Sequence, residues 1–246
     1  MPRRKQNQRD TGKWVVGLTE NDGDLYSLRF DRQFDLPLPG FAHQIVIDVE
    51  LHDPNDNGLT TSDESDALAL FDDRINDAAA GGAVLVGTLT GKAHKHHILY
   101  AMDLEWLAPW RESEQGTAYA HNFEVRIKED SDWSLYRRML PEAERADADR
   151  RILDQLASHG AHLDEPRNID WYFRFPDADR ARSAQQVLFD HEYRVETGER
   201  DTEWSVVASL TKTISLRYVI HMSAMLSSFA LDQGGTYDGW GADVDP

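Results

Sequence analysis

The chain has 246 residues, of which 40% are hydrophobic, so it can build one large domain or two smaller ones and is not a disordered chain. Its 26 basic and 44 acidic residues give a net charge of −18. Both halves are acidic: residues 1–137 contain 14 basic and 24 acidic residues, and the rest contain 12 basic and 20 acidic residues. Such a surface repels phosphate backbones and suits a basic partner, so direct nucleic-acid binding is not expected. The chain has no cysteine, which excludes disulfides, thiolate catalysis and zinc–thiolate sites.

The N-terminal residues 1–12 are predicted to form a flexible polar tail, because no apolar run follows their basic residues as it would in a secretory signal. No window approaches 18 consecutive apolar residues, so no membrane span is predicted. We therefore expect a cytoplasmic protein with no membrane contact.

The first half is predicted to hold two extra strands, KWVVGLTE and LYSLRFDRQ, followed by a β-α-β-β-α-β series. The series opens at residues 43–51, where Ile45, Ile47 and Val49 alternate onto one strand face. It continues with a helix in SDESDALALFDDRINDAAAGG, the strands AVLVGTLTG and HHILYAMD, a short helix in LEWLAPW and a strand in TAYAHNFEVRIKE.

The second half is predicted to repeat this order behind one leading helix, which we place from Pro141 to Gly160. The first strand, NIDWYFRFP, turns Trp171, Phe173 and Phe175 inward. The other elements are a helix in DADRARSAQQVLFDHEY, the strands RVETGER and EWSVVASLTKTI, a helix in SLRYVIHMSAMLSSFALDQGG and the last strand, TYDGWGADV.

The order β-α-β-β-α-β is that of the ferredoxin-like fold. We therefore predict an α+β protein of two tandem ferredoxin-like domains with antiparallel sheets, with extra N-terminal strands on the first and an extra leading helix on the second. In each domain two helices cover one sheet face, and the other face is left open for docking. Leu99 and Ala101 alternate with Ile98 and Tyr100, so part of the open face of the first sheet is expected to be covered.

A calcium-binding pattern occurs in DPNDNGLTTSDE, where Asp53, Asn55, Asn57 and Glu64 have the spacing of EF-hand ligands and Gly58 that of the turn. An EF-hand needs a helix before the loop, and here a strand is predicted. The pattern therefore favours a strand-to-helix loop with Asx turns, and a calcium site is the alternative.

Three histidines lie close together in HKHH. On a strand His94 and His96 share a face and His97 points away, and the sequence places no third ligand beside the pair, which favours a polar hairpin flank over a metal site. His221 is expected to be a hydrogen-bonded core or interface histidine. No cofactor-binding or catalytic motif is found, so neither a cofactor nor a catalytic residue is assigned.

The C-terminal strand TYDGWGADV contains two aromatic residues among glycines. Glycines within a strand mark a bulge or a close backbone approach. A strict two-residue period would place Tyr237 and Gly239 on one face and Trp240 on the other. The pattern favours a core tyrosine and a tryptophan that covers a neighbouring strand, and a docking tryptophan is the alternative. Tyr237, Gly239, Trp240 and Tyr172 are the interaction candidates, and Trp240, if exposed, is the first to test for docking.

Residues 138–246 resemble the regulator of ribonuclease E activity B (RraB) family. The resemblance rests on ILDQLASHGAHLDEPRNIDWYFRF, on the order of elements and above all on TYDGWGADV. It implies an acidic ferredoxin-like domain that is not catalytic and that lowers the activity of a ribonuclease by binding its scaffold region.

Residues 13–137 resemble the family called domain-of-unknown-function 695, through the strand before DPNDNGL, the acidic helix after it and DSDWSLYRRMLP. That resemblance implies no activity. The expected function is therefore a bacterial protein-binding regulator whose partner has a basic or disordered segment, such as a ribonuclease E-like scaffold. An enzyme or small-ligand binder that uses a groove between the domains is the rival class, and an RNA-binding module is a third.

Overall fold

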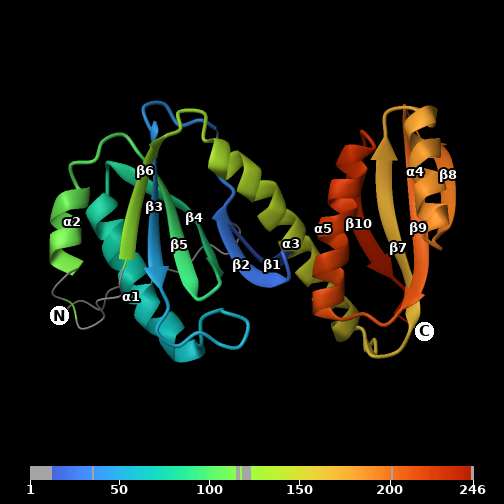
Figure 1. The fold of residues 1–246 in the computed structure, drawn as a ribbon, viewed down its shortest axis with the longest axis horizontal. Coiled ribbons are helices and arrows are strands. Elements are labelled where there is room, and N and C mark those ends of the chain that lie inside the picture. The colour runs from blue at the N-terminus through green and yellow to red at the C-terminus, as the bar shows by residue number, and fades with distance from the viewer. Residues whose placement is uncertain (1–12, 35, 115–116, 118–122, 201, 245–246) are drawn as a thin grey trace. The chain divides into compact units, whose positions relative to one another are not determined.

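The computed structural model describes residues 13–34, 36–114, 117, 123–200 and 202–244, so the predicted tail 1–12 lies outside the described residues. Residues up to 16 and residues 21–144 form one compact unit, and residues 17–20 and those from 145 onward form a second. The strands are β1 Trp14–Asn21, β2 Asp24–Asp31, β3 His43–Glu50, β4 Ala83–Gly91, β5 His94–Ala101, β6 Phe123–Glu129, β7 Arg167–Phe175, β8 Arg194–Arg200, β9 Glu203–Lys212 and β10 Thr236–Ala242 (Figure 1). The helices are α1 Ser62–Ala79, α2 Leu107–Glu114, α3 Ser134–Ser158, α4 Ala178–Asp190 and α5 Leu216–Asp232.

The N-terminal sheet has the strand order β1-β2-β4-β5-β3-β6. Its inner series β4-β5-β3-β6 is the order that a ferredoxin-like β-α-β-β-α-β unit produces, and β1 and β2 extend it beyond β4. The predicted fold class is thus confirmed for this half, including the two extra strands.

Apolar side chains cover both faces of the N-terminal sheet. On one face Phe71 of α1 and Trp110 of α2 pack with Ile45, Ile47 and Leu99. On the other face Ile98 and Tyr100 pack with Trp133 and Tyr136, and the Tyr100 and Trp133 rings stack with centroids 4.1 Å apart. The alternation of apolar residues along β5 had predicted this double burial.

Helix α3 begins seven residues before the predicted start, so the placement of Pro141 at the helix N-terminus was wrong and Pro141 lies inside the helix. The cause is a cap that the sequence pattern did not reveal. The Asp130 carboxylate accepts hydrogen bonds from the backbone N–H groups of Ser134 and Leu135. Burial of Trp133 and Tyr136 then anchors the first turns, which offsets the hydrogen bond that Pro141 cannot donate.

The C-terminal sheet has the strand order β10-β7-β9-β8, which is again the ferredoxin-like order, and α3 is its extra leading helix. Side chains of α3, α4 and α5 form one core with the inward residues of β7, among them Trp171 and Phe173. Local sequence sets the helix starts: Asp177 accepts from the N–H of Arg180 in α4, and Ser215 accepts from the N–H of Tyr218 in α5. Because the three helices share one face, the other face of this sheet carries none of them.

Within the described part of the chain, no helix combines the length and the apolar character that crossing a membrane requires.

Candidate docking face of the C-terminal unit

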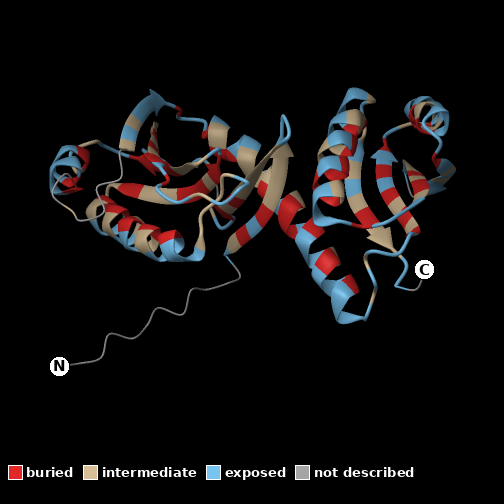
Figure 2. Ribbon diagram, turned by 60° about the horizontal axis from the view of Figure 1, so that its bottom comes forward, coloured by how far each residue is buried: buried red, intermediate tan, exposed pale blue. Residues whose placement is uncertain are grey.

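The uncovered face of the C-terminal sheet, called the open face below, is built from alternate residues of its strands. Along β7 the residues alternate between buried and more exposed, which is visible as bands on the strands in Figure 2. Register places Tyr172 beside Val207 of β9 and Gly239 of β10. The open face includes Asp170, Tyr172, Arg174, Glu196, Ser205, Val207, Ser209, Asp238, Gly239 and Gly241.

A β-bulge interrupts the last strand and overturns the predicted alternation. Tyr237 pairs with Phe173 and Trp240 pairs with Trp171, with a register shift between residues 237 and 239. Both aromatic side chains therefore point to the helix-covered face. Asp238 is the extra residue of the bulge, and Gly239, which follows it, has a φ of 104°, a backbone conformation open to glycine and costly for other residues.

Trp240 is buried in the C-terminal core, with 4% of its surface exposed. Its Nε1 donates to Asp149 Oδ1 at 2.9 Å, and Ser223 Oγ donates to the same oxygen at 3.1 Å. The Tyr237 hydroxyl lies 3.1 Å from Ser223 Oγ, and burial raises the pKa of Tyr237. Trp240 and Tyr237 thus belong to a buried polar network, and the exposure on which a docking role for Trp240 depended is not found.

Tyr172 is the interaction candidate that reaches the solvent, with 39% of its surface exposed. It borders a half-open hollow of about 620 Å³, which is also lined by Arg174, Ser205, Val207 and Asp238. Burial raises the pKa of Tyr172, and the charges of Asp170 and Asp243 raise it further. The side chain therefore presents a neutral phenol on an acidic surface.

Two hydrogen-bonded groups fix the charges on the open face. Arg174 Nη2 donates to Asp238 Oδ1 at 3.0 Å, and its Nη1 lies 3.5 Å from Glu203 Oε2. Asp170 Oδ1 accepts from Asn168 Nδ2 at 2.8 Å and from Ser209 Oγ at 2.6 Å. The open face thus combines a pre-positioned carboxylate, an exposed aromatic ring and an ion-paired guanidinium.

The predicted calcium-like loop is held by its own backbone. Glu64 is buried, and its two carboxylate oxygens accept from the N–H groups of His52 and Asp53. Asn55 Oδ1 accepts from the N–H groups of Asn57 and Leu59, which is an Asx turn, and Gly58 has a φ of 70°. A strand precedes the loop and α1 follows it, as the strand-to-helix interpretation predicts.

Millimolar calcium is expected to leave the melting temperature of the chelator-treated protein unchanged, because the side-chain oxygens of Glu64 and Asn55, two of the four ligands in the pattern, already accept backbone N–H groups. Differential scanning fluorimetry with calcium and with a chelator measures this. A calcium-dependent rise in melting temperature, matched by heat in a calorimetric titration, would contradict the loop assignment.

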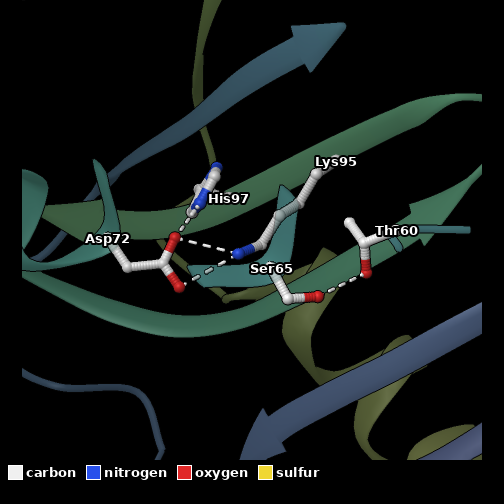
Figure 3. Close-up of polar contacts among 5 residues, drawn as sticks. All are labelled: Thr60, Ser65, Asp72, Lys95 and His97. Atoms are coloured by element: carbon white, nitrogen blue, oxygen red, sulfur yellow. Dashed lines mark hydrogen bonds and ion pairs between the residues drawn. The ribbon is translucent and has the colours of Figure 1, made fainter. Parts of the chain in front are cut away.

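The histidines of β5 separate between the two faces of the N-terminal sheet, as the sequence predicted. His94 and His96 stack, and each places Nδ1 near Asp48 Oδ1, at 2.9 and 3.3 Å. His97 lies on the helix side, where its Nε2 is 2.6 Å from Asp72 Oδ1 (Figure 3). Nowhere in the described residues do three His, Asp or Glu side chains form a group able to hold a metal ion.

Asp72 of α1 forms hydrogen bonds with both His97 and Lys95 (Figure 3). Two turns earlier on the same helix, the Ser65 hydroxyl donates to Thr60 Oγ1. Burial alone would raise the pKa of Asp72, but the His97 hydrogen bond and the charges of His97 and Lys95 outweigh it and lower the pKa to about 2. Burial lowers the pKa of His97, which is fully enclosed. The cluster therefore links α1 to β5 and has no exposed reactive group.

His221 lies on the exposed side of α5 and not in the core, and its Nδ1 is 3.2 Å from Glu20 Oε1. His221 is therefore hydrogen-bonded as expected, but it lies at the surface of the second unit.

These features define the class of the protein: a two-unit α+β chain of ferredoxin-like sheets with one uncovered sheet face. Residues 12–140 match the model of a family of unknown function, DUF695, and residues 146–242 match the model of Regulator of ribonuclease activity B, RraB. The chain belongs to the DUF695 family and carries an RraB segment behind it, which confirms the arrangement that the sequence motifs indicated.

No curated protein matches the chain. Among solved structures, a protein described as an unknown protein from Galdieria sulphuraria is 11% identical, with a TM-score of 0.23, and the match covers 82% of this chain and 98% of that one. A TM-score this low adds nothing to the fold assignment.

Proposed function

We propose that the C-terminal unit is a non-catalytic, protein-binding regulator of a ribonuclease and that it docks through the open face. The observation that carries this proposal is the match of residues 146–242 to Regulator of ribonuclease activity B. A regulator of this kind needs a surface for its target, and the helix-free sheet face supplies a candidate.

The character of the open face supports a protein partner. Its polar groups are already engaged within the protein, since Arg174 is ion-paired with Asp238 and Asp170 is hydrogen-bonded to Ser209. A helix-free sheet face with an exposed aromatic ring resembles a docking surface. The net charge of −18 on the chain favours a target with a basic segment, such as the scaffold region of an RNA-degradation assembly.

A Tyr172→Ala variant is expected to lose its ribonuclease partner and keep its fold. An exposed aromatic side chain at the centre of an interface commonly contributes about 2 kcal/mol, which corresponds to a roughly 30-fold loss of affinity. The measurement is quantitative pull-down from lysate of the source organism with isotope-labelled wild type and variant, followed by mass spectrometry and by titration of the purified ribonuclease.

The matched control is Phe189→Ala, which removes an aromatic side chain that is 67% exposed on α4, on the helix-covered side of the sheet. This variant should recover the ribonuclease as well as wild type does. Recovery of no ribonuclease by wild type would refute the regulatory function, and equal recovery by the Tyr172 variant would move the docking site away from the open face.

A further inference from the structure

Charge is distributed unevenly along β7 on the open face. At one end Arg174 is paired with two carboxylates, Asp238 and Glu203. At the other end the carboxylates of Asp170 and Asp243 lie close enough to Tyr172 to raise its pKa. Among the described residues neither of these two carboxylates has an ion-pair partner, so the negative charge around Tyr172 is not neutralised within this part of the chain.

Asp170 is held in a fixed position without being neutralised. Both donors to its Oδ1, Asn168 Nδ2 and Ser209 Oγ, are uncharged. Its Oδ2 accepts no hydrogen bond from the described residues. Neutral donors restrict the rotamer but leave the full negative charge, and the second oxygen stays available to a donor from outside.

Two glycines leave the surface beside Tyr172 free of side chains. Gly239 and Gly241 of β10 are the register partners of Tyr172 and Asp170. A methyl group at position 241 would lie 3.6 Å from the Tyr172 hydroxyl oxygen, and one at position 239 would meet nothing within 4 Å. Glycine in a strand allows another backbone to approach closely, so an extended segment can pass over β10 at this point.

Arg167 is a buried cation at this end of β7, and its guanidinium is already engaged. Its Nη1 donates to the backbone oxygens of Asp243 and Val244, at 2.9 and 2.6 Å, and its Nη2 donates to that of His162. With 1% of its surface exposed, it holds the end of β10 in place from within and does not reach the open face.

We propose that this end of the open face binds an arginine side chain of an extended, basic partner segment. The guanidinium donates to Asp170 Oδ2 and lies against the Tyr172 ring, while the partner backbone crosses Gly239 and Gly241. Arginine fits better than lysine, because its planar group can hydrogen-bond a carboxylate and stack on an aromatic ring at the same time. This inference rests on the proposed docking function and specifies its partner chemistry.

The test uses three fluorescein-labelled Gly/Ser-spaced peptides that are identical except that their repeated basic position is arginine, lysine or the neutral analogue citrulline. Fluorescence anisotropy with the full chain, at low ionic strength and at about 0.15 M salt, measures affinity. We expect the arginine peptide to bind most tightly and the citrulline peptide to bind about tenfold more weakly or worse, since its ureido group can still donate to the carboxylate but lacks the positive charge that strengthens the bond.

Two variants locate the site. Asp170→Asn keeps an acceptor for Asn168 and Ser209 but removes the charge, and it should weaken binding of the arginine peptide about tenfold while leaving the citrulline peptide unaffected. Gly241→Val covers the surface beside Tyr172 with a side chain and should weaken the arginine peptide by a similar factor. Glu196→Gln is the matched control, because Glu196 is an exposed carboxylate on the same face, in register with Val207.

Equal binding of the arginine and citrulline peptides would overturn the arginine site, because the positive charge would then not be recognised. Equal binding of the arginine and lysine peptides, or equal weakening by Asp170→Asn and Glu196→Gln, would overturn it as well, because either result reflects net charge alone. Circular dichroism of each variant checks its fold. If Tyr172→Ala loses the ribonuclease but Asp170→Asn and Gly241→Val retain it, the docking function stands and the arginine site fails. If the arginine peptide binds as expected but no ribonuclease is recovered, the site stands and the ribonuclease assignment fails.

Discussion

Replacement of Trp240 by alanine is expected to lower the free energy of unfolding of the C-terminal unit by about 4 kcal/mol, within the range for buried aromatic side chains. The side chain is 4% exposed, and its ring lies 5.9 Å from that of Trp171, centroid to centroid. The substitution leaves a cavity and also removes the Nε1 donor from Asp149, a carboxylate with only 2% of its surface exposed. Hydrogen-exchange mass spectrometry, which resolves peptides of the two units, measures the loss of protection.

Two companion variants separate packing from hydrogen bonding. Trp240→Phe keeps an aromatic ring but not the Nε1 donor, so we expect a smaller loss of about 2 kcal/mol. Leu231→Ala changes a side chain of α5 that is 69% exposed and should shift stability by less than about 0.5 kcal/mol. Unchanged protection in Trp240→Ala would show that the aromatic side chain is not part of the core.

Replacement of Asp72 by asparagine is expected to destabilise the N-terminal unit by about 3 kcal/mol, because it leaves the largely enclosed Lys95 ammonium without its carboxylate. Lys95 Nζ lies 2.9 Å from Asp72 Oδ1, and only 12% of the lysine side chain is exposed. The matched control is Asp73→Asn, which removes the same charge from an exposed neighbour on α1. Equal unfolding midpoints for the two variants in urea, followed through N-terminal-unit peptides, would contradict this role.

The same carboxylate makes the N-terminal unit sensitive to acid. The folded-state pKa of Asp72 is lowered from 3.8 to about 2, so the stabilisation is fully present above pH 4 and is lost as the pH falls from about 4 to about 2. The size of the effect is about 2 kcal/mol, from 1.36 kcal/mol per pKa unit. The wild-type protein should lose more stability over this interval than Asp72→Asn does, and parallel pH profiles would exclude the assignment.

Periodic patterns were enough to predict the layers of both units. Alternation identified the buried faces of β3 and β7, through Ile45 and Ile47 in one and Trp171 and Phe173 in the other. The order of elements along the chain then predicted the strand order of each sheet, because the connection rules of a β-α-β-β-α-β chain leave few alternatives. The same alternation also predicted that Tyr172 would point away from the helices.

What the sequence did not reveal depends on contacts between residues far apart in the chain. The start of α3 was misplaced because the favourable position of proline at a helix N-terminus is a local rule, whereas the Asp130 cap and the stacking of Trp133 on Tyr100 are tertiary. Tyr237 and Trp240 were assigned to opposite faces of the sheet because regular two-residue alternation takes no account of the extra residue in a β-bulge. Asp170 was not singled out, since its fixed position requires Ser209 from another strand.

The bulge at Asp238 and Gly239 has a consequence for how this protein tolerates insertions and deletions. The direction of each aromatic side chain in TYDGWGADV depends on how many residues separate it from its neighbour, and not on its own chemistry. Loss of one residue between the two rings would restore a regular strand, in which a spacing of two again places both rings on the helix-covered face, whereas one residue inserted beside the bulge would turn one of the rings out into the solvent. Among homologues, a change of one residue in the spacing between Tyr237 and Trp240 is therefore expected to go together with the loss or gain of the bulge.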